Sequence, residues 1–118
     1  MNLKLCESDY KFMSIIWENE PIRSGKLVEL CASRLNWKKS TTYTTLKKVC
    51  DKGLAQNENT IVTSLVKKEE VQEFESKHIM EESFSGSLPS FLASFFAGKK
   101  ISDKEANELK KLIDDFKE

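Results

Sequence analysis

The segment NWKKSTTYTTLKKVCDKG, residues 36–53, has the apolar spacing of an amphipathic helix. At 100° per residue, four side chains share one face that we expect to be buried: Thr42, Leu46, Val49 and Cys50. The opposite face begins with hydroxyl groups and ends with lysines, and Gly53 follows at a position where helices commonly end. The segment therefore predicts a helix from Lys39 or Ser40 to Lys52, with one buried and one basic face.

Two further helices are expected upstream of this segment. Tyr10, Met13, Ile16 and Trp17 form an apolar stripe, so a helix is predicted to start at Ser8 and to stop before Pro21. Ile22 has the pattern of a short extended residue. Ser24 can then cap a second helix that ends at Asn36-Trp37. The inner face of that helix is expected to hold Leu27, Val28, Cys31 and Leu35.

Downstream, residues 54–57 and 61–66 have the pattern of two short strands joined by a polar turn at Asn57–Thr60. The element order is therefore helix, short strand, helix, helix and hairpin. This order is typical of a winged helix-turn-helix, whose second and third helices are joined by a short turn. We expect a mainly α protein with a winged-helix DNA-binding domain over residues 1–66.

The remaining residues, 67–118, are expected to form a helical dimerisation domain of three helices. They are predicted from Lys68 to Phe84, from Pro89 to Gly98, and after a capping box at residues 102–105. So small a unit cannot bury this much apolar surface alone, which favours a homodimer; the alternative is a monomer whose apolar stripes fold back onto its own winged helix. The expected dimer seam consists of Phe74, Ile79, Phe84, Leu88, Phe91, Leu92, Phe95, Phe96, Leu109, Leu112, Ile113 and Phe116.

The charge is unevenly distributed. The chain has 19 Lys and Arg against 19 Asp and Glu, but residues 1–66 carry a net charge of +3 and residues 36–52 one of +4. A basic helix with hydroxyl groups suits the major groove of DNA, while an acidic protein partner would fit the same charge. The expected DNA contacts are Lys38, Lys39, Ser40, Thr41, Tyr43, Thr44, Lys47 and Lys48.

Other function classes find little support in the sequence. The one histidine, His78, has no nucleophile near it in the chain, so no enzyme is expected. Three cysteines with no zinc spacing, the absence of a long apolar run and an N-terminus without a signal-peptide core favour a reduced, cytoplasmic protein with no membrane contact. We expect no metal and no cofactor.

Several motifs resemble the penicillinase repressor family. The run SDYKFMSIIW at residues 8–17 is similar to the family's opening. Residues 36–49, with a Trp followed by Thr-x-x-Thr, are similar to the start of its recognition helix, and Lys52-Gly53-Leu54 to the end of it. Ser64-Leu65-Val66 matches the exit from the wing.

The resemblance implies a dimeric repressor that binds double-stranded DNA at a palindromic operator. It places base and phosphate contacts on Ser40, Thr41, Tyr43, Thr44 and Lys48, and wing contacts near Asn57, Asn59 and Thr60. The operon would be of the β-lactam-resistance type; an operon for another stress, or a winged helix that binds proteins and not DNA, are the alternatives.

The resemblance also implies a way of release. In antibiotic-sensing members, a membrane sensor with a metalloprotease domain triggers cleavage in the C-terminal helices, usually at Asn-Phe. The matching position here is Ser94-Phe95. Copper-sensing members have a cysteine-rich C-terminal metal site, which this chain lacks because no cysteine follows Cys50.

Overall fold

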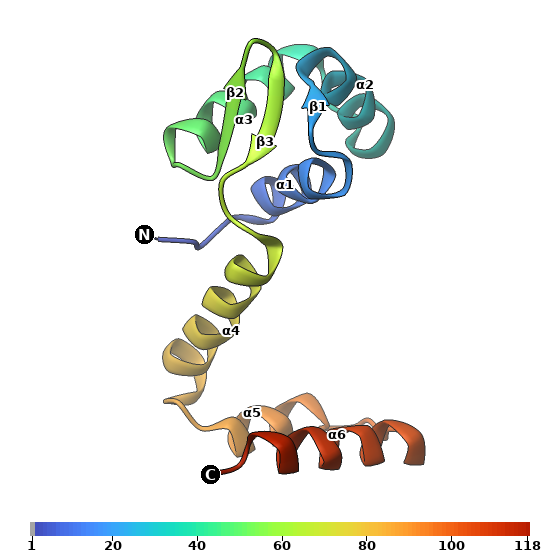
Figure 1. Ribbon diagram of the computed structural model, residues 1–118. Helices are drawn as coiled ribbons and strands as arrows, with labels where there is room; N and C mark the ends of the chain where they lie inside the picture. Colours follow the sequence, from blue (N-terminus) through green and yellow to red (C-terminus); the bar gives the residue numbers. More distant parts are fainter. Residues whose placement is uncertain (1) are drawn as a thin grey trace. The chain divides into compact units, whose positions relative to one another are not determined.

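The structure, a computed structural model, describes residues 2–118 and divides into two compact units that meet in sequence at His78 and Ile79 (Figure 1). The first unit contains three helices, a small sheet and the beginning of a fourth helix. The second contains the rest of that helix and two more. The elements are α1 (Glu7–Asn19), β1 (Ile22–Arg23), α2 (Ser24–Leu35), α3 (Lys39–Asp51), β2 (Ala55–Glu58), β3 (Ile61–Ser64), α4 (Lys68–Phe84), α5 (Leu88–Phe95) and α6 (Asp103–Phe116).

The sheet has three antiparallel strands in the order β1-β3-β2. Ile22, expected as a lone extended residue, pairs with Val62, and so ties the connection between α1 and α2 to the hairpin. Between β2 and β3 the chain reverses through Asn59 and Thr60, which both have positive φ, at 51° and 66°. Two such residues form the tight hairpin turn whose twist matches that of the strands.

The core of the first unit lies where α1, α2 and α3 pack around this sheet (Figure 1). The predicted apolar faces are confirmed in part, since Met13, Ile16, Leu27, Cys31, Leu46 and Val49 are buried, and Val71 from the start of α4 is also buried. Phe12 and Ile15 of α1 are buried although they lie outside the predicted stripe, and five predicted positions are only partly buried: Tyr10, Trp17, Val28, Leu35 and Cys50. The fully buried apolar side chains are Phe12, Met13, Ile16, Leu27, Cys31, Val49, Leu54, Val62 and Val71. This unit therefore has a complete core of its own.

The end of α3 is fixed by its own backbone. Gly53 has a φ of 78°, and its N–H donates to the Cys50 carbonyl at 3.0 Å. The Leu54 N–H donates to the Val49 carbonyl at 3.0 Å, and the two side chains are both fully buried. This is the pair of bonds that ends a helix at a glycine, and it sets the point at which α3 gives way to the hairpin.

The junction between the hairpin and α4 is held by two side chains, one in α1 and one just after its end. The Trp17 indole N–H donates to the Val66 carbonyl at 3.0 Å. Just beyond the end of α1, the Glu20 carboxylate accepts hydrogen bonds from the Ser64 backbone N–H and hydroxyl, at 2.9 and 2.7–2.8 Å. The start of α4 is thereby part of the winged-helix unit.

Several predicted boundaries need correction. Helix α1 begins at Glu7, one residue before Ser8, because Cys6 adopts the extended conformation that precedes a helix. Ser24 is the first residue of α2 and not its cap, since Arg23 is still extended as a strand residue. The strands cover 55–58 and 61–64, not 54–57 and 61–66, because the turn takes only two residues and leaves Glu58 paired with Ile61.

The predicted helices of the second half are present, with α5 ending at Phe95, before Gly98. The Ser87 hydroxyl accepts the Ser90 N–H at 3.2 Å at the start of α5, and the Ser102 hydroxyl accepts the Glu105 N–H at 3.2 Å at the start of α6. The compact units divide within α4, whereas the sequence places the domain boundary between residues 66 and 67; that boundary stays a prediction.

Candidate nucleic-acid interface

The candidate DNA-binding surface of the first unit is the outer face of α3. Its inner face is closed, since Thr42, Leu46 and Val49 are buried as predicted. The residues expected to contact DNA lie outside that core, and all of them are exposed: Lys38, Lys39, Ser40, Thr41, Tyr43, Thr44, Lys47 and Lys48. One helix therefore presents hydroxyl and ammonium groups together on its open side.

The N-terminus of α3 has no side-chain cap. Lys38 precedes the helix in an extended conformation and makes no capping hydrogen bond. The first intrahelical bond runs from the Thr42 N–H to the Lys38 carbonyl at 3.1 Å, so the N–H groups before Thr42 have no partner within the helix. Free N–H groups and the positive end of a helix dipole favour an anion, and Lys38 and Lys39 add charge at the same end.

Tyr43 connects α3 to the wing. Its hydroxyl donates to the Ser24 hydroxyl oxygen at 3.4 Å, and the Ser24 backbone N–H donates to the Thr60 carbonyl at 2.8 Å. The Tyr43 ring remains partly exposed, and the Lys39 ammonium lies 6.0 Å from its centre. The helix and the turn of the hairpin are thus held in a fixed relation through the first residue of α2.

The wing residues Asn57, Asn59 and Thr60 are all exposed at the tip of the hairpin. Asn57 faces Val62 in the ladder, while Asn59 and Thr60 form the turn. These residues and the face of α3 belong to the same compact unit.

The lysines at the C-terminal end of α3 are not equivalent. Lys47 pairs with Asp51 at 3.1 Å one helical turn away, with both side chains largely exposed. An exposed pair of this kind contributes little and can be exchanged readily for another anion. Lys47 is therefore available to a ligand.

Lys48 has a partner that sequence reasoning missed. Its ammonium lies 2.9 Å from the Asp9 carboxylate of α1, and the Lys52 ammonium lies 3.6 Å from the same oxygen. Asp9 is only 2% exposed. Burial alone would raise the pKa of Asp9, but the Lys48 ammonium, the Cys6 thiol and the Lys52 charge together hold that pKa below its ordinary value. The same contact raises the pKa of Lys48.

The local sequence does not reveal this contact. Asp9 lies in the first turn of α1, where acidic residues interact favourably with the helix dipole. Acidic residues at such positions are normally exposed, and nothing in the local pattern distinguishes a buried one. Contact between α1 and α3 is a consequence of the tertiary fold.

The residues expected to form a dimer seam are unburied within one chain. Residues 79–118 contain no buried side chain, and Leu88, Phe95, Leu112 and Ile113 are about half exposed. Aromatic rings contact each other along the chain, with Phe84 and Phe91 edge to face at 5.3 Å. Phe95, on the carboxyl side of the expected cleavage bond, lies in the last turn of α5, and Ser94 beside it is exposed.

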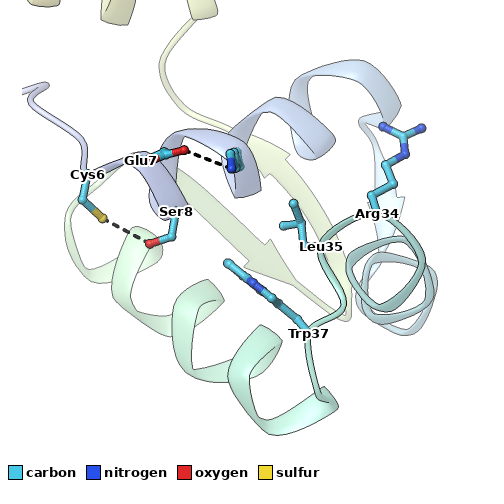
Figure 2. Close-up of a pocket in the computed structure, with 7 residues that line it drawn as sticks. Cys6, Glu7, Ser8, Arg34, Leu35 and Trp37 are labelled. Carbon is cyan, nitrogen blue, oxygen red and sulfur yellow. Dashed lines mark hydrogen bonds and ion pairs between the residues drawn. The ribbon is translucent and has the colours of Figure 1, made fainter.

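A pocket of about 600 Å³ lies between α1 and the end of α2, with Cys6, Glu7, Ser8, Arg34, Leu35 and Trp37 in its lining (Figure 2). Its cations already have partners, since Lys11 pairs with Glu7 at 3.0 Å and Arg34 with Glu18 at 2.6 Å. The Trp37 ring stacks on Phe12 at 5.8 Å. Because its cations are already paired, the pocket is a weaker candidate for an anion-binding site than the exposed face of α3.

Within residues 2–118, no cluster of three metal-ligating side chains occurs. None of the helices in that range has the length and apolar character needed to cross a bilayer.

Comparison with known proteins gives three matches of interest. A family model described as penicillinase repressor matches residues 5–115. The penicillinase repressor of Bacillus licheniformis is 20% identical over 118 residues, covering 97% of this chain and 92% of that protein. Among solved structures, Staphylococcus aureus MarR in complex with salicylate and kanamycin aligns with a TM-score of 0.51 at 15% identity, over 94% of this chain and 70% of that one. The last match supports the winged-helix fold.

Proposed function

The chain belongs to the penicillinase repressor family and is a transcriptional repressor, not an enzyme; on that premise we propose that it binds a palindromic operator as a homodimer in the cytoplasm. Helix α3 lies in the major groove, with Ser40, Thr41, Tyr43 and Thr44 toward base edges and nearby phosphates. The lysines neutralise the DNA backbone: Lys38, Lys39, Lys47 and Lys48. The observation that carries the proposal is the exposed hydroxyl and lysine face of α3, opposite an inner face on which Thr42, Leu46 and Val49 are buried.

The wing supplies the second contact of each protomer. Asn57, Asn59 and Thr60 lie at the tip of the hairpin, where short polar side chains can reach a phosphate or the minor groove. The bond from Ser24 to the Thr60 carbonyl fixes the hairpin turn against α2. The wing is therefore positioned before DNA arrives, which lowers the entropic cost of binding.

Dimerisation follows from the unburied apolar side chains of residues 79–118. A buried Phe or Leu contributes about 1.5–3 kcal/mol, so a unit with no buried side chain gains from pairing with a second copy. Two linked winged helices bind two half-sites with an avidity about 10²–10⁴ times that of either alone. Loss of the dimer is thus sufficient to release the operator.

The inducing step is cleavage at or beside Ser94-Phe95, downstream of a membrane sensor-protease. The bond lies in the last turn of α5, a helix without a buried residue, so local unwinding costs little there. Cleavage would separate Phe95 and α6 from the rest of the seam. The B. licheniformis relative is named for penicillinase, which favours an operon of the β-lactam-resistance type.

Salt dependence of DNA binding tests this function. Fluorescence anisotropy with a mixed-sequence duplex about three turns long is expected to show affinity falling steeply as salt rises. Lys39→Ala and Lys47→Ala should each reduce the slope of log K against log salt by about 0.9. Lys110→Ala, an exposed lysine of α6, is the control with the same loss of charge and should leave the slope unchanged.

An acidic partner protein is the competing outcome. If the chain bound polyglutamate but not the duplex, or if Lys110→Ala weakened DNA binding as much as Lys39→Ala, the assignment of α3 to DNA would be wrong.

A further inference from the structure

We propose that Asp9 is a built-in competitor for DNA: it holds Lys48 in the free protein and gives it up to a phosphate in the complex, so that Asp9 limits the affinity of the repressor. This inference rests on the proposed function, because it assumes that α3 meets DNA. Asp9 would then be a positioning residue, acting through Lys48 and not by touching DNA.

The first argument is the place of Asp9. It lies in the first turn of α1, with its side chain 2% exposed, while Lys48 in the last turn of α3 and Lys52 just after that helix both lie close to its carboxylate. Figure 2 shows the first turn of α1, marked by Cys6 and Ser8, next to the green α3 helix. A negative charge is thus built in behind the surface that must attract a polyanion.

The second argument is how Lys48 is held. The Asp9 Oδ2 atom is buried and has no partner with hydrogen-bond geometry among residues 2–118, although the Lys48 ammonium is 2.9 Å away. The contact is therefore an ion pair at hydrogen-bond distance whose hydrogen bond is poorly aligned, and a poorly aligned bond holds the ammonium less firmly than a well-aligned one. Lys48 itself is half exposed, with 49% of its side chain open to solvent. It can turn outward without unpacking the core.

The third argument is that Asp9 has a replacement cation. When Lys48 leaves, a buried carboxylate would normally be left unpaired at a high cost. Lys52 is 3.6 Å from the same oxygen, and its positive charge helps to lower the pKa of Asp9. Two ammonium groups share one carboxylate, so one can be transferred while the other remains.

The consequence is a definite cost on every DNA complex. Lys48 must leave Asp9 before it can pair with a phosphate. The binding free energy therefore includes only the difference in free energy between the Lys48–phosphate pair and the Lys48–Asp9 pair. Removing the Asp9 charge while keeping the shape of its side chain should therefore tighten binding, which no purely structural role predicts.

The experiment measures the affinity of full-length variants for a mixed-sequence duplex about three turns long by anisotropy at fixed salt. Asp9→Asn is expected to bind at least about threefold more tightly than Glu7→Gln, the control with the same charge change in the same turn of α1, whose partner is Lys11. In a Lys48→Ala background, Asp9→Asn should give no gain beyond that of Glu7→Gln.

A second measurement needs no substitution that could harm folding. In the wild-type protein, the carboxyl ¹³C resonance of Asp9 should shift when the duplex is added, while that of Glu7 should not. A folded Asp9→Asn variant that binds no more tightly than Glu7→Gln, or an Asp9 resonance that does not respond to DNA, would overturn the inference alone. Failure of the wild-type protein to bind any duplex would overturn the proposed function and this inference with it.

Discussion

Side chains on α3 differ in what holds them, and that difference decides what each can give to DNA. Thr44 is exposed and has no side-chain partner among the described residues, whereas Tyr43 is tied to Ser24 and Lys48 to Asp9. A short hydroxyl on a groove-facing helix can bond to several base edges, while a lysine contributes mostly a point charge. Removing a hydroxyl group and removing an ammonium group should therefore change DNA binding in different ways.

Replacing Thr44 with alanine should affect the choice of sequence more than the strength of non-specific binding. We expect the ratio of operator to mixed-sequence affinity to fall by about 5- to 150-fold, because a base contact is worth about 1–3 kcal/mol. The salt slope should stay unchanged, since no charge is lost. Selection from a random DNA pool, followed by titration of the selected and scrambled duplexes, measures both quantities; equal losses on both duplexes would argue against a base contact.

The Asp9 pair should make stability depend on acid pH. The pKa of Asp9 is below its ordinary value in the folded protein, so its stabilising contribution is fully present above the ordinary value of 3.8 and is lost as the pH falls through the lower, folded-state pKa. Urea unfolding at pH 7 and pH 2.5 is expected to show Asp9→Asn less stable than wild type at neutral pH, with the gap narrowing in acid. A gap that stayed constant would mean that the charge of Asp9 does not stabilise the fold.

For single residues, the sequence predicted which side chains of α3 are exposed, but it did not predict which side chains form ion pairs. The helical period placed Thr42, Leu46 and Val49 inside and the candidate DNA contacts outside, because burial of a helix face follows from its own spacing. It could not predict that Asp9 meets Lys48, since the two are 39 positions apart and their contact depends on how α1 crosses α3.

At the scale of the secondary elements, the hairpin turn holds a residue in an unfavourable backbone conformation. Its turn places Thr60 at a φ of 66°, a conformation that is unfavourable for a β-branched residue. The carbonyl of that residue accepts the Ser24 N–H, so the turn cannot relax without losing its link to α2. The local sequence, Asn-Glu-Asn-Thr, contains no glycine, which is why a longer turn was predicted.

Glycine at position 60 should stabilise the wing. Thr60→Gly removes the steric cost of positive φ, about 1–2 kcal/mol, and the greater freedom of glycine in the unfolded chain returns about 0.4–1 kcal/mol of it. We expect a net gain of up to about 1 kcal/mol by urea denaturation. Thr63→Gly, in β3 of the same hairpin, is the control and should be destabilising; if both variants lost stability equally, the strain assigned to Thr60 would be wrong.

Helix ends were predictable wherever a residue with a special conformation marks them. Gly53 ends α3, and the residue before α6, Ser102, caps it, as their types indicate. The start of α2 was less predictable, because Arg23 pairs with Ile61 in a ladder that forms only after the hairpin has folded back. Pairing between strands that are far apart in the chain leaves no signal in the local sequence.

For the molecule as a whole, the two units differ in whether they have a closed hydrophobic core. The winged helix has a closed core, whereas residues 79–118 leave every side chain at least partly exposed. Such a unit supports the proposed homodimer, in which a second copy would cover these side chains. The sequence indicated this imbalance through its density of apolar residues, but it contains no information on how two copies would interlock.

A charge placed in the apolar face of α5 should separate the protomers. Phe95→Asp is expected to give a monomer by sedimentation velocity and to lose about 10²–10⁴-fold in operator affinity, while the preference for the half-site sequence is kept. Ser90→Asp, an exposed position on the opposite side of the same helix, is the matched control and should remain dimeric. A Phe95→Asp protein that sedimented as a dimer would contradict the seam.

Hydroxyl-radical footprinting of an operator selected by the full-length protein tests most directly whether paired α3 helices occupy DNA. The account predicts two symmetry-related protected regions with centres about one helical turn apart, or a small multiple of it, filled at two protein chains per duplex. Protection of a single region by one chain, or none at any salt concentration, would contradict it.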